Sequence, residues 1–416
     1  LCDWSSDVCS SDLPKGSTIK ISFVGYKTLE VKWNGSPLNI ILKEDSEMLD
    51  EVVVVGYGTQ KKVNVTGAVS MVGAEVIESR PVANVTQALQ GAVPGLNLTV
   101  GGNGGDLNSG MNINIRGTGT IGDGSGSSPL VLIDGIEGNL NTVNPNDIES
   151  VSVLKDAASA SIYGARASFG VILVTTKSGK SGKTNVNYSG NVRFNDAIGI
   201  PELMDSYTFA QYFNRASSNR GGGDIFSPAV MERIKAYQEG TLTATTVDNG
   251  SGIWQKWANA NGNTDWFGEF YDNWVPSQEH NLSISGGTEK LQYVLSGSFL
   301  DQKGLLRHGT DKFQRYTLNS KITANITDWL KVTLNSKWTR EDFQRPTYLT
   351  SSFFHNLARK WPVHPAYDPN GFPMDEGEIE QMENGGEQNS QKDYYTNQLH
   401  VVIEPIKNWR INLEGS

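Results

Sequence analysis

Residues 316–338 read YTLNSKITANITDWLKVTLNSKW, and the alternation of apolar and polar residues in this stretch decides the fold. Nearly every second residue of 316–326 is apolar, and the same holds for 330–338. Successive side chains of a β-strand point to opposite faces, so a period of two predicts two strands that each have one apolar face. The short Thr327-Asp328 connection predicts a tight turn between them.

The same alternation recurs throughout the second half of the chain. It marks about seven segments, four of which have the roughly 9–11 residues of a membrane-spanning β-strand, while the three at 280–286, 397–403 and 409–413 are shorter. The segments are 186–194, 280–286, 291–299, 316–326, 330–338, 397–403 and 409–413. Lysine and arginine on their polar sides suit a watery lumen. We therefore expect residues 183–416 to form the first part of a transmembrane antiparallel β-barrel, in which lipid-facing and lumen-facing residues alternate.

The connections between these segments support a barrel, because they alternate in length. Residues 196–277 and 341–393 are long connections, whereas GGTE at 286–289 and PIKN at 405–408 are tight. Long loops at one end and short turns at the other are typical of outer-membrane barrels, and a soluble β-sandwich shows no such parity. Aromatic residues near the predicted strand ends fit the interfacial girdles of such a barrel. These residues are Trp266, Phe267, Tyr271, Trp274, Trp329, Trp338 and Trp409.

Residues 62–180 mix helical and strand patterns with glycine-rich loops, and they predict a compact α+β domain. A short helix over 86–93 ends at Pro94-Gly95, because proline and glycine interrupt a helix. A second helix is expected over 156–164, with Asp156 as its N-cap. Strands are expected over 111–117, 129–135 and 170–179, and a helical turn followed by a strand over 144–154.

The chain before residue 48 predicts little structure of its own. Residues 14–47 contain two or three short strand patterns, too few to bury a core alone, and look like the remnant of an N-terminal β-sandwich. Both cysteines, Cys2 and Cys9, lie within residues 1–13, where DWSSDVCSSDL is the translation of a common sequencing-library adapter. A disulfide between them is geometrically possible, but we expect residues 1–13 to be non-native. Genomic DNA that encodes this peptide in the source organism would contradict that expectation.

The linker over 48–61 contains the stretch DEVVVVGYG, residues 50–58. It could be a buried strand, the start of a dinucleotide-binding fold, or a segment that a partner grasps. The dinucleotide fingerprint needs a third glycine at the position of Lys61, so that reading fails. β-Branched valines favour extended backbone, which suits both a buried strand and a segment that a partner binds.

Composition and motif spacing exclude several function classes. The formal net charge is −10 and no basic stripe is present, which argues against a nucleic-acid partner. No apolar run approaches the roughly 18 residues of a membrane helix. The five histidines are scattered, with no HExxH, and no GxSxG occurs. GKSGKT at 179–184 is not a phosphate loop, because Lys177 stands where the first glycine is needed. The residues therefore predict no catalytic site, no metal site and no cofactor.

Several long motifs occur in a consistent order along the chain. They are KGSTIKISFVGYKTLEV, LDEVVVVGYGTQKK, LQGAVPGLNL, INIRGTGT, PLVLIDG, NPNDIESVSVLKDAASASIYGARA and GVILVTTKSGK. On these motifs, residues 14–416 resemble SusC/RagA-type TonB-dependent outer-membrane transporters of Bacteroidota. One departure is Ser168-Phe169, where the family usually has Ala-Asn, and we expect local repacking there.

The resemblance implies TonB-dependent active import of a nutrient across the bacterial outer membrane, without enzymatic activity. Residues 62–180 would be the plug domain, and 183–416 about seven strands of a 22-stranded plugged barrel. Residues 14–47 would be the end of a carboxypeptidase-regulatory-like domain. The plug and the N-terminal extension would face the periplasm. The signal peptide, the start of that domain and the remaining barrel strands would lie outside this sequence.

The resemblance also makes the linker a TonB box, the segment that couples transport to energy. TonB, energised by ExbB and ExbD, would add a strand to it by β-augmentation, in which main-chain hydrogen bonds supply affinity. We expect the valines to be extended and unpaired until TonB pairs with them. The TonB-binding residues would be Asp50, Glu51, Val52, Val53, Val54, Val55 and Gly56.

A SusD-like surface lipoprotein is implied as the partner that captures substrate, most often an oligosaccharide and less often a peptide. Trp254, Trp257 and Trp361 in the long loops could stack on sugars or could form loop core. Arg116, in the IRG motif, is the expected plug–barrel ion-pair residue. The alternative is a soluble or secreted β-rich glycan-binding or adhesive protein, which would need neither the plug motifs nor the loop parity.

Overall fold

The computed structural model describes most of the chain after residue 67 and short segments before it. The described residues are 16–21, 29–35, 40, 52–55, 58–61, 68–80, 82–100, 107, 110–117, 128–374, 377–407 and 409–416. The chain divides into two compact units, Leu1–Thr66 and Gly67–Ser416. Cys2, Cys9 and the rest of 1–13 lie outside the described residues, so the non-native origin of that peptide stays a prediction.

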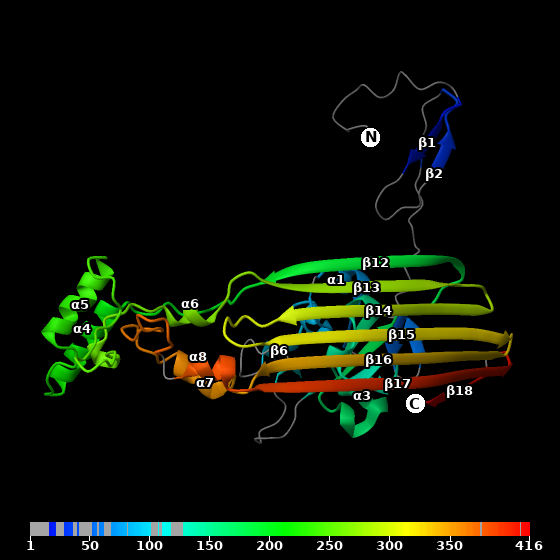
Figure 1. Ribbon diagram of the computed structural model, residues 1–416. Coiled ribbons are helices and arrows are strands. Elements are labelled where there is room, and N and C mark those ends of the chain that lie inside the picture. The colour runs from blue at the N-terminus through cyan, green and yellow to red at the C-terminus, as the bar shows by residue number, and fades with distance from the viewer. Residues whose placement is uncertain are drawn as a thin grey trace. The chain divides into compact units, whose positions relative to one another are not determined.

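The first unit contains two antiparallel strand pairs, of which β1 and β2 are labelled near the N-terminus in Figure 1. Strand β1 (Thr18–Ile21) pairs with β2 (Leu29–Lys32), in the region where a sandwich remnant is expected. Strand β3 (Val52–Val55) pairs with β4 (Gly58–Lys61) within the linker.

The second unit begins with the α+β domain that the sequence predicts. Its main sheet has five strands in the order β5-β10-β11-β8-β9. Strand β11 runs parallel to β8, and every other neighbouring pair is antiparallel. The bounds are β5 (Val69–Gly73), β8 (Leu130–Ile133), β9 (Ile136–Glu137), β10 (Ile148–Leu154) and β11 (Val171–Thr176). Apolar side chains of β10 and β11, such as Val151, Val153 and Ile172, are fully buried in its core.

Short helices and one further strand pair complete this domain. Asn84 caps α2 by accepting a hydrogen bond from the Gln87 N–H, and Asp156 caps α3 from the Ser159 N–H, as predicted for Asp156. The bounds are α1 (Ala74–Glu78), α2 (Val85–Leu89), β6 (Leu96–Val100), β7 (Met111–Ile115), η2 (Leu140–Thr142), η3 (Pro145–Asp147), α3 (Ala157–Ala160) and η4 (Ser161–Ala167).

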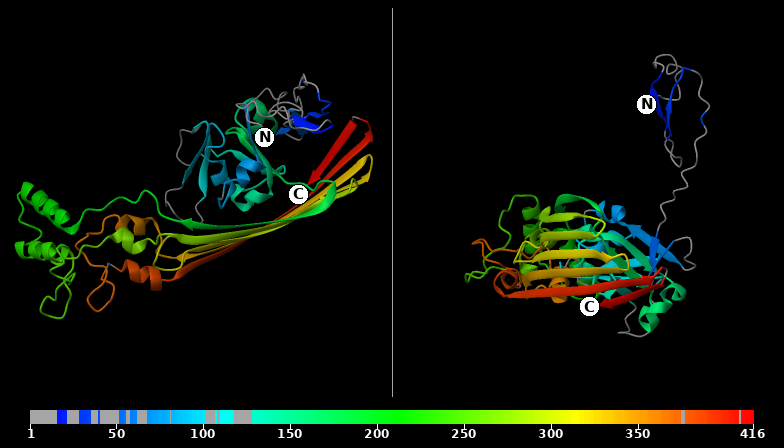
Figure 2. Two further views of the ribbon diagram at one scale, coloured as in Figure 1. Left: turned by 90° about the horizontal axis from the view of Figure 1, so that it is seen from above. Right: turned by 90° about the vertical axis from the view of Figure 1, so that its right-hand side faces the viewer.

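A single antiparallel sheet of seven strands, in chain order from β12 to β18, follows the plug. The bounds are β12 (Gly182–Asn195), β13 (Val275–Gly287), β14 (Leu291–Lys303), β15 (Lys312–Thr327), β16 (Leu330–Pro346), β17 (Glu387–Ile406) and β18 (Trp409–Gly415). Every segment predicted from the period of two lies inside one of these strands. The sheet curves around the plug, which lies on its concave side (Figure 2). In the described part of the chain, β12 and β18 do not pair with each other.

The two faces of this sheet have opposite polarity. The buried side chains of its concave face are mainly polar, and include Glu279, Asn281, Ser296, Arg315, Thr317, Asn335, Thr339, Glu341 and Gln398. On the convex face, apolar side chains are exposed, and include Val186, Tyr188, Leu282, Leu295, Leu318, Ile322, Leu334 and Leu399. Such a surface is unfavourable in water and favourable against lipid, as expected for a barrel wall in a membrane.

The two long connections fold into small helical clusters. One cluster includes Phe226 and Ile234 from the first connection and Val363 from the second, and another joins Trp266 to Phe353. The helices are α4 (Ser206–Asn219), α5 (Pro228–Gln238), η5 (Trp257–Asn259), α6 (Trp266–Phe270), α7 (Ser351–Leu357) and α8 (Glu378–Asn384). Among the described residues, no helix is both long and apolar enough to cross a membrane.

The aromatic girdle is only partly as predicted. Trp274, Trp329 and Trp409 are exposed, as a membrane interface requires. Trp266 is instead fully buried in a loop cluster, with Phe267 and Tyr271 packed against the same cluster, so the girdle prediction is wrong for these three residues. Loop cores and membrane interfaces both use aromatic side chains, and proximity to a strand end does not distinguish the two environments.

Candidate functional site at the plug–barrel contact

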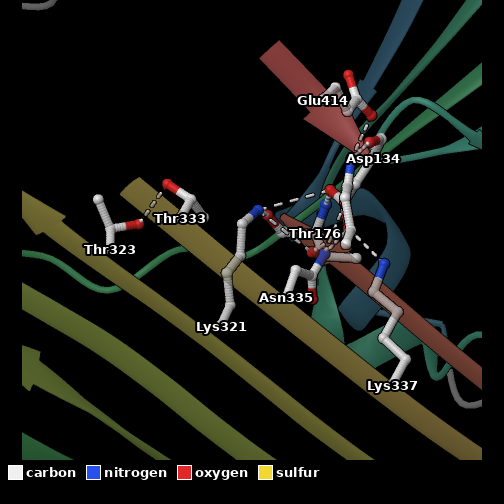
Figure 3. A network of polar contacts seen from close by, with 9 residues as sticks. Asp134, Thr176, Lys321, Thr323, Thr333, Asn335, Lys337 and Glu414 are labelled. Carbon is white, nitrogen blue, oxygen red and sulfur yellow. Dashed lines mark hydrogen bonds and ion pairs between the residues drawn. The ribbon is translucent and has the colours of Figure 1, made fainter. Parts of the chain in front are cut away.

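Asp134 occupies the tip of a plug hairpin. Strands β8 and β9 are joined by Asp134 and Gly135 alone, whose φ values are +50° and +92°. Two successive residues with positive φ define a type I′ turn, for which Asp-Gly is a preferred sequence. The turn places the Asp134 carboxylate against the inner face of strands β15 and β16 (Figure 3).

The Asp134 carboxylate is the centre of a polar network. In the plug, Thr176 donates to it from its main-chain N–H at 2.9 Å and from its hydroxyl at 2.7 Å. In the barrel wall, the Asn335 amide donates at 3.0 Å and the Lys337 ammonium forms a hydrogen-bonded ion pair. The Lys321 ammonium lies 3.5 Å from the carboxylate (Figure 3). One plug residue therefore connects β11 to two barrel strands.

The network keeps Asp134 ionised. Burial by itself would raise the pKa of this carboxyl, because desolvation penalises its charged form. The ammonium groups of Lys337 and Lys321 outweigh burial and hold the pKa of Asp134 well below its usual range. Only 8% of the Asp134 side chain is exposed, so water screens the ion pairs little. Removing one partner of such a buried pair leaves an uncompensated charge and is strongly destabilising.

Gln398 of β17 adds further hydrogen bonds between the Asp134 turn and the barrel. Its amide donates to the main-chain oxygen of Asp134 at 2.7 Å and to the carboxylate of Glu414, in β18, at 2.5 Å. A Cβ atom at Gly135 would lie 3.1 Å from the same Glu414 carboxylate. The turn therefore favours glycine for its positive φ, and a larger residue at this position would also displace the Glu414 carboxylate.

The pKa of a second plug carboxylate, Asp147 in η3, is shifted in the opposite direction to that of Asp134. This carboxylate accepts a hydrogen bond from the Asn319 amide of β15 at 2.8 Å, and Ser296 of β14 also bonds to it. Burial raises the pKa of Asp147, and these neutral donors only partly offset that effect. The contact thus holds one carboxylate that is stabilised as an anion and one that favours its proton.

Arg315 of β15 holds the plug through main-chain carbonyl groups. Its Nη1 donates to the Asn141 oxygen at 2.6 Å and its Nη2 to the Ala83 oxygen at 2.7 Å. The two plug segments are joined to each other by a hydrogen bond of 3.2 Å between Thr86 and Asn141. Thr339 of β16 adds a bond of 3.1 Å to a plug carbonyl oxygen.

A cavity of about 280 Å³ lies between the plug and the barrel wall. The plug lines it with residues that include Ile133, Asn139 and Val143, and the barrel with Asn319, Lys337 and Tyr394 among others. Its volume and mixed polar lining suit several water molecules. The segment around η2 therefore has room on its barrel side.

Arg116 does not make the predicted contact with the barrel. It follows β7 with a φ of +59°, its side chain is exposed, and no ion pair joins it to a strand of the barrel within the described residues. Its electrostatic neighbours, Lys155 and Asp156, belong to the plug. The plug–barrel ion pair is made instead by Asp134.

The expected TonB box is described only at Val52–Val55, since Asp50, Glu51 and Gly56 lie outside the described residues. The four valines form an extended strand, as expected. The expectation that they are unpaired is wrong in this structure, because β4 pairs with one edge of β3. In the described part of the chain, the second edge of β3 pairs with no other strand.

The three tryptophan candidates occupy different positions in the outer loops. Trp361 packs against Phe209 and Phe213 in a loop core, with ring centroids 5.3 and 4.9 Å apart. Trp257 lies 5.4 Å from the Trp361 ring, and 36% of it is exposed. Trp254 forms a separate β-bridge with Asp248. The structure therefore brings Trp257 and Trp361 together, and Trp257 is the more open of that pair.

The residues of the Asp134 network were missed in the sequence, although part of the signal was present. The motif PLVLIDG contains Asp134-Gly135 directly after an apolar strand, which is the pattern of a two-residue hairpin. Such a turn exposes its aspartate at a tip, where a partner can reach it. Nothing in the local pattern of Lys321 or Lys337 indicates which lumen-facing lysine would be that partner.

Comparison with known proteins agrees with this architecture. Residues 61–171 match the TonB-dependent Receptor Plug Domain family. The chain is 32% identical over 336 residues to the TonB-dependent receptor SusC of Bacteroides thetaiotaomicron. The aligned residues cover 78% of this chain and 29% of SusC. It is also 32% identical over 356 residues to the TonB-dependent receptor P39 of Formosa agariphila, covering 84% of this chain and 30% of that receptor.

A solved structure of the RagAB peptide importer, in its "open-open" state, has a similar fold. The TM-score is 0.66 at 26% identity, over 88% of this chain and 42% of that chain. This chain therefore spans less than half the length of each of these relatives, which are receptors and transporters. The plug match and the structural likeness confirm the predicted fold class, a plug domain followed by part of a transmembrane barrel. The chain belongs to the SusC/RagA-type TonB-dependent transporter family.

Proposed function

We propose that this chain contributes the plug and the first barrel strands of a transporter that imports a nutrient across the bacterial outer membrane. The observation that carries the proposal is the buried Asp134 network, which fixes a plug domain to the polar inner face of a barrel wall. A large barrel without a plug would leave an aqueous hole in the membrane. The contact is therefore suited to keep the pore closed until energy is supplied.

The energy would be supplied by TonB, acting with ExbB and ExbD from the periplasmic side. Strand β3 offers its second edge to an added strand, and main-chain hydrogen bonds would supply the affinity. The candidate contact residues are Asp50, Glu51 and Gly56 together with the four valines. A pull on this segment, which precedes the plug in the chain, would displace the plug from the barrel wall. In this arrangement the plug and the N-terminal extension face the periplasm.

An oligosaccharide is the proposed cargo, captured with a SusD-like surface lipoprotein at the outer loops. Trp257 favours this class, because an exposed aromatic ring can stack on a sugar. A peptide is the second candidate, supported by the 26% identity to the RagAB peptide importer. Uptake assays with labelled oligosaccharides and labelled peptides, in cells with and without the gene, would separate the two.

The TonB step is tested by replacing Val53 and Val54 with proline in the complete receptor that contains this chain. Proline lacks the N–H needed for strand pairing, so uptake should fall to the level of cells without TonB, while substrate binding at the surface persists. Replacing the same two valines with isoleucine keeps the backbone donors and should preserve uptake. Uptake that survives the proline variant unchanged would contradict the proposal.

A further inference from the structure

We propose that Arg315 is a positioning residue with two alternative sets of acceptors: the plug carbonyls in the closed state, and Glu341 once the plug has moved. The inference rests on the proposed function, because it concerns the displacement of the plug during import. It assigns to Glu341, a residue of the barrel wall that does not hold the plug, the role of stabilising the displaced state.

The register of the sheet places the two residues side by side. Arg315 in β15 is directly opposite Glu341 in β16, and both are buried, with exposed fractions of 3% and 9%. Directly opposed residues in an antiparallel pair have Cβ atoms about 5 Å apart, so a guanidinium can reach the facing carboxylate. Yet no hydrogen bond or ion pair joins Arg315 to Glu341 in this structure.

The plug holds Arg315 away from that carboxylate. Both terminal nitrogens of the guanidinium donate to plug carbonyls, while its Nε atom is buried without a hydrogen-bond partner. The neighbouring wall is apolar: Leu300, Phe313 and Phe343 pack together, with Ala83 of the plug against them. A guanidinium bonds a carboxylate more strongly than it bonds neutral carbonyls, so the arrangement persists only while the plug supplies two acceptors.

Displacement of the plug removes both acceptors at once. A buried guanidinium without acceptors carries a large desolvation penalty, which would oppose plug movement. Glu341 can remove that penalty by accepting from Arg315. The other carboxylate at the same height of the wall, Glu279, is already in an ion pair of 3.0 Å with Arg193. Glu341, which faces Lys392 of β17 on its other side but forms no close ion pair with it among the described residues, is therefore the acceptor that remains for Arg315.

The test replaces Glu341 with glutamine, and separately with aspartate, in the complete receptor. Glu341→Gln should lower the maximal rate of TonB-dependent uptake by about tenfold, the loss expected for one charge-assisted bond. The substrate concentration at half-maximal uptake, the amount of receptor in the outer membrane and the exclusion of a large antibiotic should all stay at wild-type values, because the hydrogen bonds that hold the closed plug to Arg315 do not involve Glu341. Glu341→Asp keeps the carboxylate and should recover most of the rate. Asp342→Asn, one residue along β16 and on its other face, is the matched control and should leave uptake unchanged.

Wild-type uptake by Glu341→Gln would overturn the inference, as would equal losses in the glutamine and aspartate variants. A Glu341→Gln receptor that fails to reach the outer membrane would overturn it as well, since the closed state would then depend on this carboxylate. Uptake by the unaltered receptor that continues in cells without TonB would be a different result, and would contradict the proposed function itself.

Discussion

Asp134 at the tip of a plug hairpin and Lys337 in barrel strand β16 form a buried ion pair between residues 203 positions apart in the chain. The pair joins a two-residue type I′ turn of the plug to the inner face of barrel strand β16. Because Thr176 fixes the same carboxylate from within the plug, movement of the hairpin alone is resisted. Displacing the plug must therefore break a contact whose charges are shielded from water.

Asp134→Asn should weaken the attachment of the plug. The substitution keeps the shape of the side chain but leaves the Lys321 and Lys337 ammonium groups without their carboxylate. We expect a loss of about 3 kcal/mol in the stability of the plug–barrel contact. In cells, the variant receptor should admit a large antibiotic that the unaltered outer membrane excludes, and this sensitivity is the measurement.

Asp393→Asn provides the matched control for that prediction. Asp393 in β17 also pairs with a cation, Arg340, at 2.8 Å, but both side chains are well exposed. Water and salt screen such a pair, so its loss should leave antibiotic exclusion unchanged. Equal sensitivity in the Asp134 and Asp393 variants would show that the buried network has no special role in closing the pore.

Asp147→Asn should not destabilise the folded receptor at neutral pH, in contrast to Asp134→Asn. Because burial raises the pKa of Asp147, the folded protein holds this proton more tightly than the unfolded chain. Stability from this group is greatest below the ordinary carboxyl pKa and declines as the pH rises toward the raised value. Asparagine mimics the protonated form, so the variant should unfold at the same or a higher temperature than the unaltered receptor at pH 7, with no advantage near pH 3. A lower unfolding temperature at pH 7 would contradict this account.

The barrel strands could be predicted because lipid and lumen impose opposite demands on alternate residues. Leu318 and Ile322 are exposed on one face, whereas Thr317 and Asn335 are buried on the other. That contrast between the two faces produces the alternation of apolar and polar residues in 316–338. The plug strands were also predictable, since buried runs such as residues 171–174 are continuously apolar.

The contact between the two domains was less predictable, because it depends on positions that only the fold brings together. Arg116 and Asp134 both follow a plug strand at a positive φ, yet only Asp134 reaches barrel cations. Trp266 illustrates the same limit, since an aromatic residue near a strand end can face either lipid or a loop core. In both cases the local sequence identifies the type of interaction but does not identify the partner.

Trp361→Ala should loosen the outer loops. This side chain crosses from the β16–β17 connection into the core formed by the β12–β13 connection, against Phe209 and Phe213. Truncating a packed tryptophan typically costs about 3 kcal/mol. Amide hydrogens of helices α4 and α5 should therefore exchange faster in the variant. Trp257→Ala removes a more exposed ring, so it should leave this exchange unchanged and lower affinity for an oligosaccharide. Faster exchange in the Trp257 variant alone would show that Trp257, and not Trp361, holds the loop core together.

Helix α4 should lose its N-terminal cap in acid. The Asp205 carboxylate accepts hydrogen bonds from the Thr208 hydroxyl at 2.6 Å, from the Tyr207 and Thr208 N–H groups at 2.9 and 3.0 Å, and from Gln238 at 2.9 Å. The Thr208 hydroxyl and Gln238 bonds, followed by the main-chain bonds, lower the pKa of Asp205 to about 2. A lowered carboxyl pKa means that the cap contributes fully above the ordinary value of about 4 and is lost as the pH falls from there toward about 2.

Hydrogen exchange in the first turn of α4 measures this cap. Asp205→Ala should reduce protection of these amides by about 1 kcal/mol at neutral pH, as expected for a lost N-cap. Asp205→Asn keeps a side-chain acceptor and cannot ionise, so it should retain most of the protection at neutral pH and show no further loss between pH 4 and pH 2. The unaltered protein should lose protection in that interval, after correction for the intrinsic pH dependence of exchange. If the asparagine variant shows the same acid-dependent loss, another group must be responsible, because asparagine has no proton to gain at this position.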